Sequence, residues 1–112
     1  MSATDQSWFT EAHEGSGSSI GFRTRARLHA EQTPFQSIEI HDSTDWGKLM
    51  VIAGCMMLTT RDTFFYHEMM SHPALFTHPR ARRVVIIGGG DCGTLREVLR
   101  HESVESAVQV EI

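Results

Sequence analysis

The sequence has 112 residues, of which 40% are hydrophobic and 21% are charged, a balance typical of soluble globular proteins. The formal net charge of −4 argues against a nucleic-acid-binding protein, which usually presents a basic face. No apolar stretch approaches the roughly 18 residues that a membrane span needs, and no signal peptide is recognisable. Two cysteines, Cys55 and Cys92, indicate no disulfide framework. We therefore predict a cytoplasmic protein with neither nucleic-acid nor membrane partners.

The N-terminal half is predicted to be mostly antiparallel β structure. Residues 1–19 are polar and end in "GSGSS", which is typical of a flexible loop or turn. Within residues 20–31, Arg23, Arg25 and Arg27 alternate with other residues, which indicates an extended strand with one charged face. Residues 36–58 are predicted to form a β-hairpin, in which "DSTDWG" supplies the turn and Gly54 bends the returning arm.

A helix is predicted to follow this β region. Asp62 is a suitable N-cap for a helix that begins at Thr63, and the Phe and Met residues of "FFYHEMM" fit a helical core face. Pro73 is expected to end this helix or to open a second short one at "PALF". We place a domain boundary here, with an N-terminal β domain and linker helix over residues 1–72 and a second domain over residues 73–112.

The last 30 residues follow a strand–helix–strand pattern. Residues 84–87, "VVII", are continuously apolar, as in a strand that is buried on both faces of a parallel sheet. Residues 94–101 have apolar side chains at helical spacing, and "SAVQVEI" at 106–112 is typical of a second strand. The predicted fold class is therefore α/β, with a small antiparallel β domain followed by the start of a Rossmann-like domain.

Three glycines join the first strand of this unit to its helix. Gly88, Gly90 and Gly93 fit the pattern G-x-G-x-x-G, and Glu111 lies 18 residues past the last of them, at the end of the next strand. The glycines allow a tight turn and a close approach of a ligand to the backbone, while the carboxylate can accept both hydrogen bonds of a ribose diol. This context predicts a nucleoside-binding site, whereas no Gly-Lys-Ser/Thr follows to form a phosphate-binding P-loop.

Asp91 changes the expected ligand. It places a negative charge beside the helix N-terminus, where a phosphate would otherwise bind. A nucleoside that carries a cation, such as a sulfonium or an ammonium, suits this position better. Asp91 is also a plausible helix N-cap, and both roles are compatible.

The histidines do not predict a metal site. In "HEMMSH", His67 and His72 are five residues apart, about 140° around a helix, whereas zinc-binding H-E-x-x-H places both histidines on one face.

From Thr33 to Ile112 the chain resembles the spermidine synthases, the polyamine aminopropyltransferases. The motif "YHEMMSHP" followed by "IGGGDCGTLRE" carries this resemblance. It implies a small β-stranded domain and a Rossmann-like domain of the methyltransferase type, assembled as a homodimer or homotetramer. The implied reaction transfers an aminopropyl group from decarboxylated S-adenosylmethionine, a co-substrate rather than a cofactor, to putrescine, giving spermidine and methylthioadenosine.

The resemblance also implies roles for individual residues. Gln36 and His67 would contact the nucleoside donor, Asp91 would hold its ammonium, and Glu111 would bind its ribose hydroxyls. Tyr66 would lie beside the reacting amine and sulfonium as a catalytic residue, although core packing is the alternative for this side chain. An in-line displacement at a carbon next to a sulfonium asks the protein mainly to align two cations and to accept a proton, for which carboxylates are suited.

Three departures from the family pattern stand out. Cys92 replaces a glycine, and we expect an ordinary backbone there. Ala53 stands where the family often has aspartate. The chain also ends before the aspartate-rich loop that carries the family's catalytic base, so we expect a truncated and inactive piece. An S-adenosylmethionine-dependent methyltransferase and a non-catalytic oligomerisation module remain alternatives.

Overall fold

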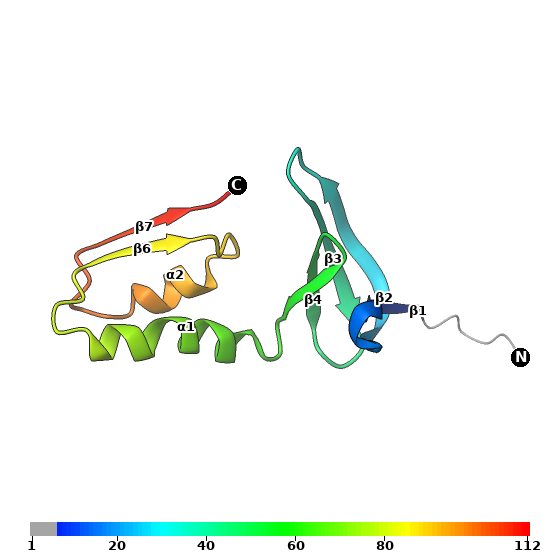
Figure 1. Cartoon of the computed structure of the whole chain (residues 1–112), viewed down its shortest axis with the longest axis horizontal. Coiled ribbons are helices and arrows are strands. Elements are labelled where there is room, and N and C mark those ends of the chain that lie inside the picture. The colour runs from blue at the N-terminus through cyan, green and yellow to red at the C-terminus, as the bar shows by residue number, and fades with distance from the viewer. Residues whose placement is uncertain (1–6) are drawn as a thin grey trace, which may run out of the picture. The chain divides into compact units, whose positions relative to one another are not determined.

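The computed structural model describes residues 7–112, which fall into two compact units (Figure 1). The first unit extends to Asp62 and the second comprises Thr63–Ile112. The boundary that we predicted between residues 72 and 73 therefore falls inside a helix of the second unit. Among the described residues, no helix has both the length and the apolar character needed to cross a membrane.

The first unit is a five-stranded antiparallel sheet in which the strands follow one another in chain order. Its strands are β1 (Ser7–His13), β2 (Ser18–Gln32), β3 (Ser37–Ser43), β4 (Lys48–Ile52) and β5 (Cys55–Thr59), with a short 3-10 helix, η1 (Glu14–Ser16), between the first two. The predicted strand over 20–31 and the predicted hairpin over 36–58 are confirmed. The returning arm of the hairpin is shorter than expected, because it ends at Ile52 and Gly54 lies in a turn that reverses the chain into the further strand β5.

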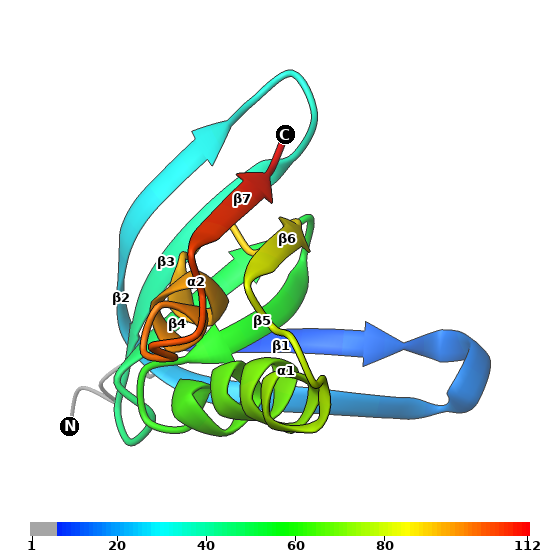
Figure 2. The same cartoon turned by 90° about the vertical axis from the view of Figure 1, so that its left-hand side faces the viewer.

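The long strand β2 serves two partners in succession. Its first half pairs with β1 and its second half with β3, with register shifts near Ala26 and His29. Figure 2 shows this strand bending along its length, from the blue hairpin with β1 to the cyan hairpin with β3. The bend lets one sheet curve around a small core, in which Phe22, Leu49 and Val51 are buried.

The turn between β4 and β5 explains one departure from the family pattern. Ala53 and Gly54 both have positive φ angles, of 51° and 80°, and they connect the paired residues Ile52 and Cys55. This is the geometry of a two-residue type I′ turn. Aspartate tolerates such a backbone better than alanine does, so we expect alanine at position 53 to make this turn less stable than aspartate would.

The loop predicted at "GSGSS" is confirmed for residues 15–17, which lie in η1 and the turn after it, whereas β2 already begins at Ser18. The strand β1 over Ser7–His13 was not predicted, and residues 1–6 lie outside the described residues. The alternation was hard to recognise because one of the two inward-facing side chains of β1 is the acid Glu11. Its carboxylate accepts a hydrogen bond from the backbone N–H of Met56 in β5, at 2.7 Å.

The second unit is built from α1 (Thr63–Thr77), β6 (Arg83–Ile87), α2 (Gly93–Val98) and β7 (Ser106–Val110). Strands β6 and β7 pair in parallel, which confirms the predicted strand–helix–strand unit. In Figure 1, α2 lies between this pair of strands and α1. Every second side chain of the strands points away from α2 and is exposed: Val85, Ile87, Val108 and Val110.

Pro73 does not end α1, contrary to the prediction. The helix continues through it to Thr77, because a proline costs a helix mainly its missing N–H bond to the carbonyl four residues earlier. That earlier residue is Met69, and both Met69 and Pro73 are exposed, so water can reach this side of the helix. The Thr77 hydroxyl adds a hydrogen bond to the Pro73 carbonyl at 2.6 Å.

Candidate functional site

The glycine loop connects β6 to α2 and depends on backbone conformations that favour glycine. Gly88 and Gly89 have φ angles of 81° and 72°. The Gly88 N–H donates to the Val110 carbonyl at 2.7 Å, which ties the loop to the end of β7. The Gln109 side-chain amide adds hydrogen bonds to the carbonyls of Gly88 and Gly89. The loop is therefore a fixed structure at the carboxyl ends of two parallel strands, where ligands bind in open α/β sheets.

Asp91 lies in this loop just before α2. Its Oδ1 accepts a hydrogen bond from the Gly93 N–H at 2.7 Å, so the carboxylate satisfies one of the free donors at the start of the helix. The N-cap residue itself is Cys92, whose side chain makes no capping bond. The side chain of Asp91 keeps 21% exposure. Its helix-capping role is thus present, and the carboxylate remains accessible to a ligand.

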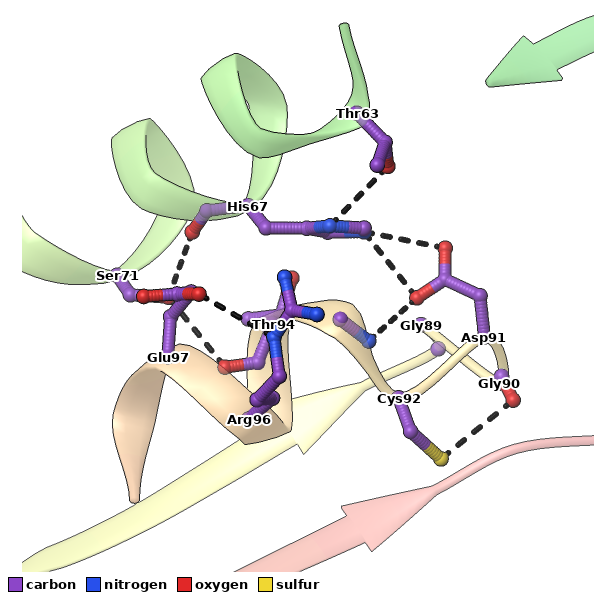
Figure 3. Close-up of polar contacts among 12 residues, drawn as sticks. Thr63, His67, Ser71, Gly89, Gly90, Asp91, Cys92, Thr94, Arg96 and Glu97 are labelled. Carbon is purple, nitrogen blue, oxygen red and sulfur yellow. Dashed lines mark hydrogen bonds and ion pairs between the residues drawn. The ribbon is translucent and has the colours of Figure 1, made fainter. Parts of the chain in front are cut away.

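His67 reaches the loop from α1 (Figure 3). Its Nε2 lies 3.2 Å from each carboxylate oxygen of Asp91, and its Nδ1 lies 3.2 Å from the Thr63 hydroxyl. The residue is only 3% exposed. A Cβ atom on Gly93 would overlap the imidazole ring, so this glycine is required by the close approach of the ring to the backbone. Both ring nitrogens of His67 therefore already have partners within the protein.

Glu111 follows β7 and faces the middle of the same loop. Its Oε2 accepts a hydrogen bond from the Gly90 N–H at 2.8 Å, and its Oε1 accepts one from the Ile112 N–H at 2.9 Å. A Cβ atom on Gly90 would lie 2.9 Å from the Cγ of Glu111, closer than such contacts normally come. Gly90 thus makes room for the carboxylate, which is exposed beside Asp91's loop.

The remaining predicted residues differ in their surroundings. Tyr66 lies on α1 next to His67, with the ring centroids 5.5 Å apart, and it is 59% exposed. Among the described residues, Tyr66 is therefore not packed into a core, which was the alternative role for this side chain. Gln36 belongs to the first unit, in the turn between β2 and β3, where its backbone bonds to Thr33. Its role stays a prediction.

Cys92 contradicts the expectation of an ordinary backbone. Its φ of 63° and ψ of 10° are left-handed, a region that glycine adopts freely and that costs other residues about 1–2 kcal/mol. The thiol is exposed and lies 3.6 Å from the Gly90 carbonyl. The loop keeps the conformation that glycine would favour, and the cysteine is strained within it.

Relief of this strain gives a testable result. Cys92→Gly should raise the free energy of unfolding by about 0.5–1 kcal/mol, because the removed strain slightly exceeds the entropic cost of glycine. Thermal unfolding measures the change. Cys92→Ala is the matched control: it removes the thiol but keeps a Cβ, so it should bring no gain, and equal gains in both variants would contradict the role of the backbone.

A second polar cluster joins the other ends of α1 and α2. The buried Glu97 accepts hydrogen bonds from Arg100 at 2.8 Å and from His72 Nε2 at 3.2 Å, and His72 Nδ1 lies 2.8 Å from His101 Nε2. Burial by itself would raise the pKa of Glu97, but the hydrogen bond and charge of Arg100, with His72 and Arg96, hold the pKa below its usual value. Glu97 is therefore an anion that fastens the two helices together.

A cleft of about 580 Å³ opens beside this cluster and is lined by residues that include Phe76, Arg100 and His101. None of the predicted site residues lines it. Within residues 7–112, no group of three or more His, Cys, Asp or Glu side chains is arranged to hold a metal ion.

Known proteins match both units of the chain. The family model of the spermidine synthase tetramerisation domain matches residues 7–60, and the model of the spermine/spermidine synthase domain matches residues 63–112. The chain belongs to the spermidine synthase family. Two polyamine aminopropyltransferases, from Xanthomonas euvesicatoria and Xanthomonas axonopodis, are 64% and 65% identical over 98% and 100% of this chain. The chain spans 39% of the length of each.

Solved structures agree with this membership. The spermidine synthase from Thermotoga maritima is 39% identical and superimposes with a TM-score of 0.91, over 96% of this chain and 38% of that protein. A spermidine synthase in complex with the transition-state analogue AdoDATO gives the same identity and TM-score, over 96% of this chain and 37% of that one. The fold of a β-stranded N-terminal region followed by a Rossmann-like beginning is thereby confirmed.

Sequence reasoning missed Thr63 and Ser71, two residues of α1 that bond to His67. Thr63 and Ser71 flank His67 at positions i−4 and i+4, on the same face of α1. The Ser71 hydroxyl donates to the His67 carbonyl at 2.8 Å, and it also lies 3.4 Å from the Thr94 carbonyl of α2. The spacing of three polar residues at intervals of four was a recognisable signal, but it lay within a run that we interpreted as a mainly apolar core face.

Proposed function

We propose that this chain is the N-terminal part of an enzyme that transfers an aminopropyl group from decarboxylated S-adenosylmethionine to putrescine. The products are spermidine and methylthioadenosine. The supporting observation is the pair of accessible carboxylates, Asp91 in the glycine loop and Glu111 after β7, which both accept hydrogen bonds from the backbone of that loop. Membership of a family that contains polyamine aminopropyltransferases adds weight to the proposal.

The chemistry assigns a different task to each carboxylate. In the proposed reaction the putrescine nitrogen attacks the carbon next to the sulfonium, the carbon–sulfur bond breaks with its electrons going to sulfur, and the attacking amine loses a proton. Glu111 accepts hydrogen bonds from the ribose diol of the donor. Asp91 binds the ammonium at the end of the aminopropyl group and so fixes the direction of that group. The exposed ring of Tyr66 borders the reacting atoms.

We place the general base outside these 112 residues, because Asp91 and Glu111 are both committed to holding the donor. The chain alone is accordingly expected to be inactive. The match of residues 7–60 to a tetramerisation domain favours a homotetramer over the homodimer. The cytoplasmic location and the lack of nucleic-acid partners stay predictions.

Donor selectivity tests this proposal. An enzyme of full family length that carries this sequence should bind decarboxylated S-adenosylmethionine at least about tenfold more tightly than S-adenosylmethionine, because the extra carboxylate of the latter would be repelled by Asp91. Isothermal calorimetry measures both affinities. Asp91→Asn, which keeps an acceptor for the Gly93 N–H, should abolish most of the preference. A wild-type protein with equal affinities would instead favour a methyltransferase.

A further inference from the structure

A chain of three side chains connects the first residue of α1 to the glycine loop (Figure 3). The Thr63 hydroxyl contacts His67 Nδ1 at 3.2 Å, and His67 Nε2 contacts both carboxylate oxygens of Asp91 at 3.2 Å. Thr63 itself is half-buried, His67 is 3% exposed and the Asp91 side chain is 21% exposed. The chain thus leads from the protein interior to an accessible carboxylate.

The Asp91 carboxylate determines which ring nitrogen of His67 must carry a hydrogen. An ionised carboxylate only accepts hydrogen bonds, so Nε2 must carry a hydrogen to interact favourably with Asp91. The Thr63 hydroxyl can donate to or accept from Nδ1, so it gives this nitrogen a partner while Nε2 donates to Asp91. A ring held at both nitrogens fixes the direction from which Nε2 contacts the Asp91 carboxylate.

The packing around the His67 ring leaves little room for another orientation of the ring. It lies against the backbone of Gly93, where even a methyl group would overlap it. Its own backbone is held by Ser71, whose hydroxyl donates to the His67 carbonyl and lies near the Thr94 carbonyl. With so little exposure, water cannot readily replace a lost partner at Nδ1.

We infer that Thr63 is a positioning residue, which acts through His67 to hold the Asp91 carboxylate in the orientation that binds the donor's ammonium. This inference rests on the proposed function and deepens it. It also changes the role that the resemblance implied for His67: the ring acts on Asp91 and does not hydrogen-bond the nucleoside, since both of its nitrogens are engaged within the protein.

Two substitutions separate the effect of the Thr63 hydroxyl from the effect of the shape of the side chain. Thr63→Val keeps the β-branched shape and removes the hydroxyl, whereas Thr63→Ser keeps the hydroxyl. Two ligands separate ammonium recognition from general damage, because decarboxylated S-adenosylmethionine has the ammonium and methylthioadenosine lacks it. The affinities are measured by calorimetry in an enzyme of full family length that carries this sequence.

Thr63→Val should lower the affinity for decarboxylated S-adenosylmethionine about tenfold, as expected for one misdirected charged hydrogen bond. Its affinity for methylthioadenosine should change less than about twofold. Thr63→Ser should keep the wild-type affinity for the donor. Equal losses for both ligands, or no loss for the donor, would overturn the inference but leave the proposed function standing. A wild-type protein that binds neither ligand would overturn both.

The ring itself provides a measurement that does not depend on the folding of a variant. Nitrogen-15 NMR of the histidine side chains in the wild-type protein should show a hydrogen on Nε2 of His67. A hydrogen on Nδ1 alone would overturn the inference, because the ring could then not donate to Asp91.

Discussion

Replacement of Gly93 by alanine should abolish donor binding. The added methyl group would occupy the place of the His67 ring, which is buried and bonded on both sides. To make room, the ring must leave Asp91 or the glycine loop must open, and either movement dismantles the site. We expect the donor affinity to fall by more than about a hundredfold and the free energy of unfolding to fall by about 1–3 kcal/mol, the usual cost of overpacking.

Two comparisons make this result specific. Gly15→Ala is the matched control, because a Cβ atom there would meet nothing within 4 Å and the φ of Gly15 is not positive. It should change neither binding nor stability by more than about 0.5 kcal/mol. In the background His67→Ala, where the ring is absent, Gly93→Ala should bring little further loss of stability. A full additional loss in that background would show that the damage does not pass through the ring.

Much of this site was predictable from the sequence, because its geometry follows from local rules. The junction is a strand, a glycine loop and a helix, and each part has its own local signal: a continuously apolar run, three spaced glycines and apolar residues at helical spacing. The acid at the end of the next strand then reaches that junction by the parallel pairing of the strands, and Glu111 indeed bonds to Gly90. Asp91 was assigned to the start of the helix for the same reason; its carboxylate does bond to the Gly93 N–H, although the N-cap residue itself is Cys92.

The parts that were missed depend on contacts distant in the sequence or on backbone strain. No local pattern shows that the Glu11 carboxylate of β1 caps a backbone N–H of β5, 45 residues away. The helix α1 continues past Pro73 because of exposure on one side, which becomes known only when its packing is known. Cys92 adopts a left-handed backbone because the surrounding loop imposes it, against the preference of the residue itself.

The last prediction concerns the first unit, which has a very small core. Among residues 7–62, the buried apolar cluster consists of Phe22, Leu49 and Val51, with Phe9 and Met56 packed against it. Leu49 is completely buried, and its truncation to alanine should cost about 3 kcal/mol. A unit of about 60 residues has a total stability on the order of 3–9 kcal/mol, so this loss is a large fraction of what holds the sheet together.

Leu49→Ala should therefore cause the sheet to unfold before the second unit does, and any assembly made through residues 7–60 should be lost with it. Amide hydrogen exchange would show faster exchange throughout β3, β4 and β5 and little change in β6 and β7, while sedimentation reports the assembly. Met57→Ala is the control, since this side chain on β5 is 53% exposed and its truncation creates no cavity. If both variants exchanged alike, the cluster around Leu49 would not be the source of the sheet's stability, and the curvature and hydrogen bonding of β2 would have to supply it.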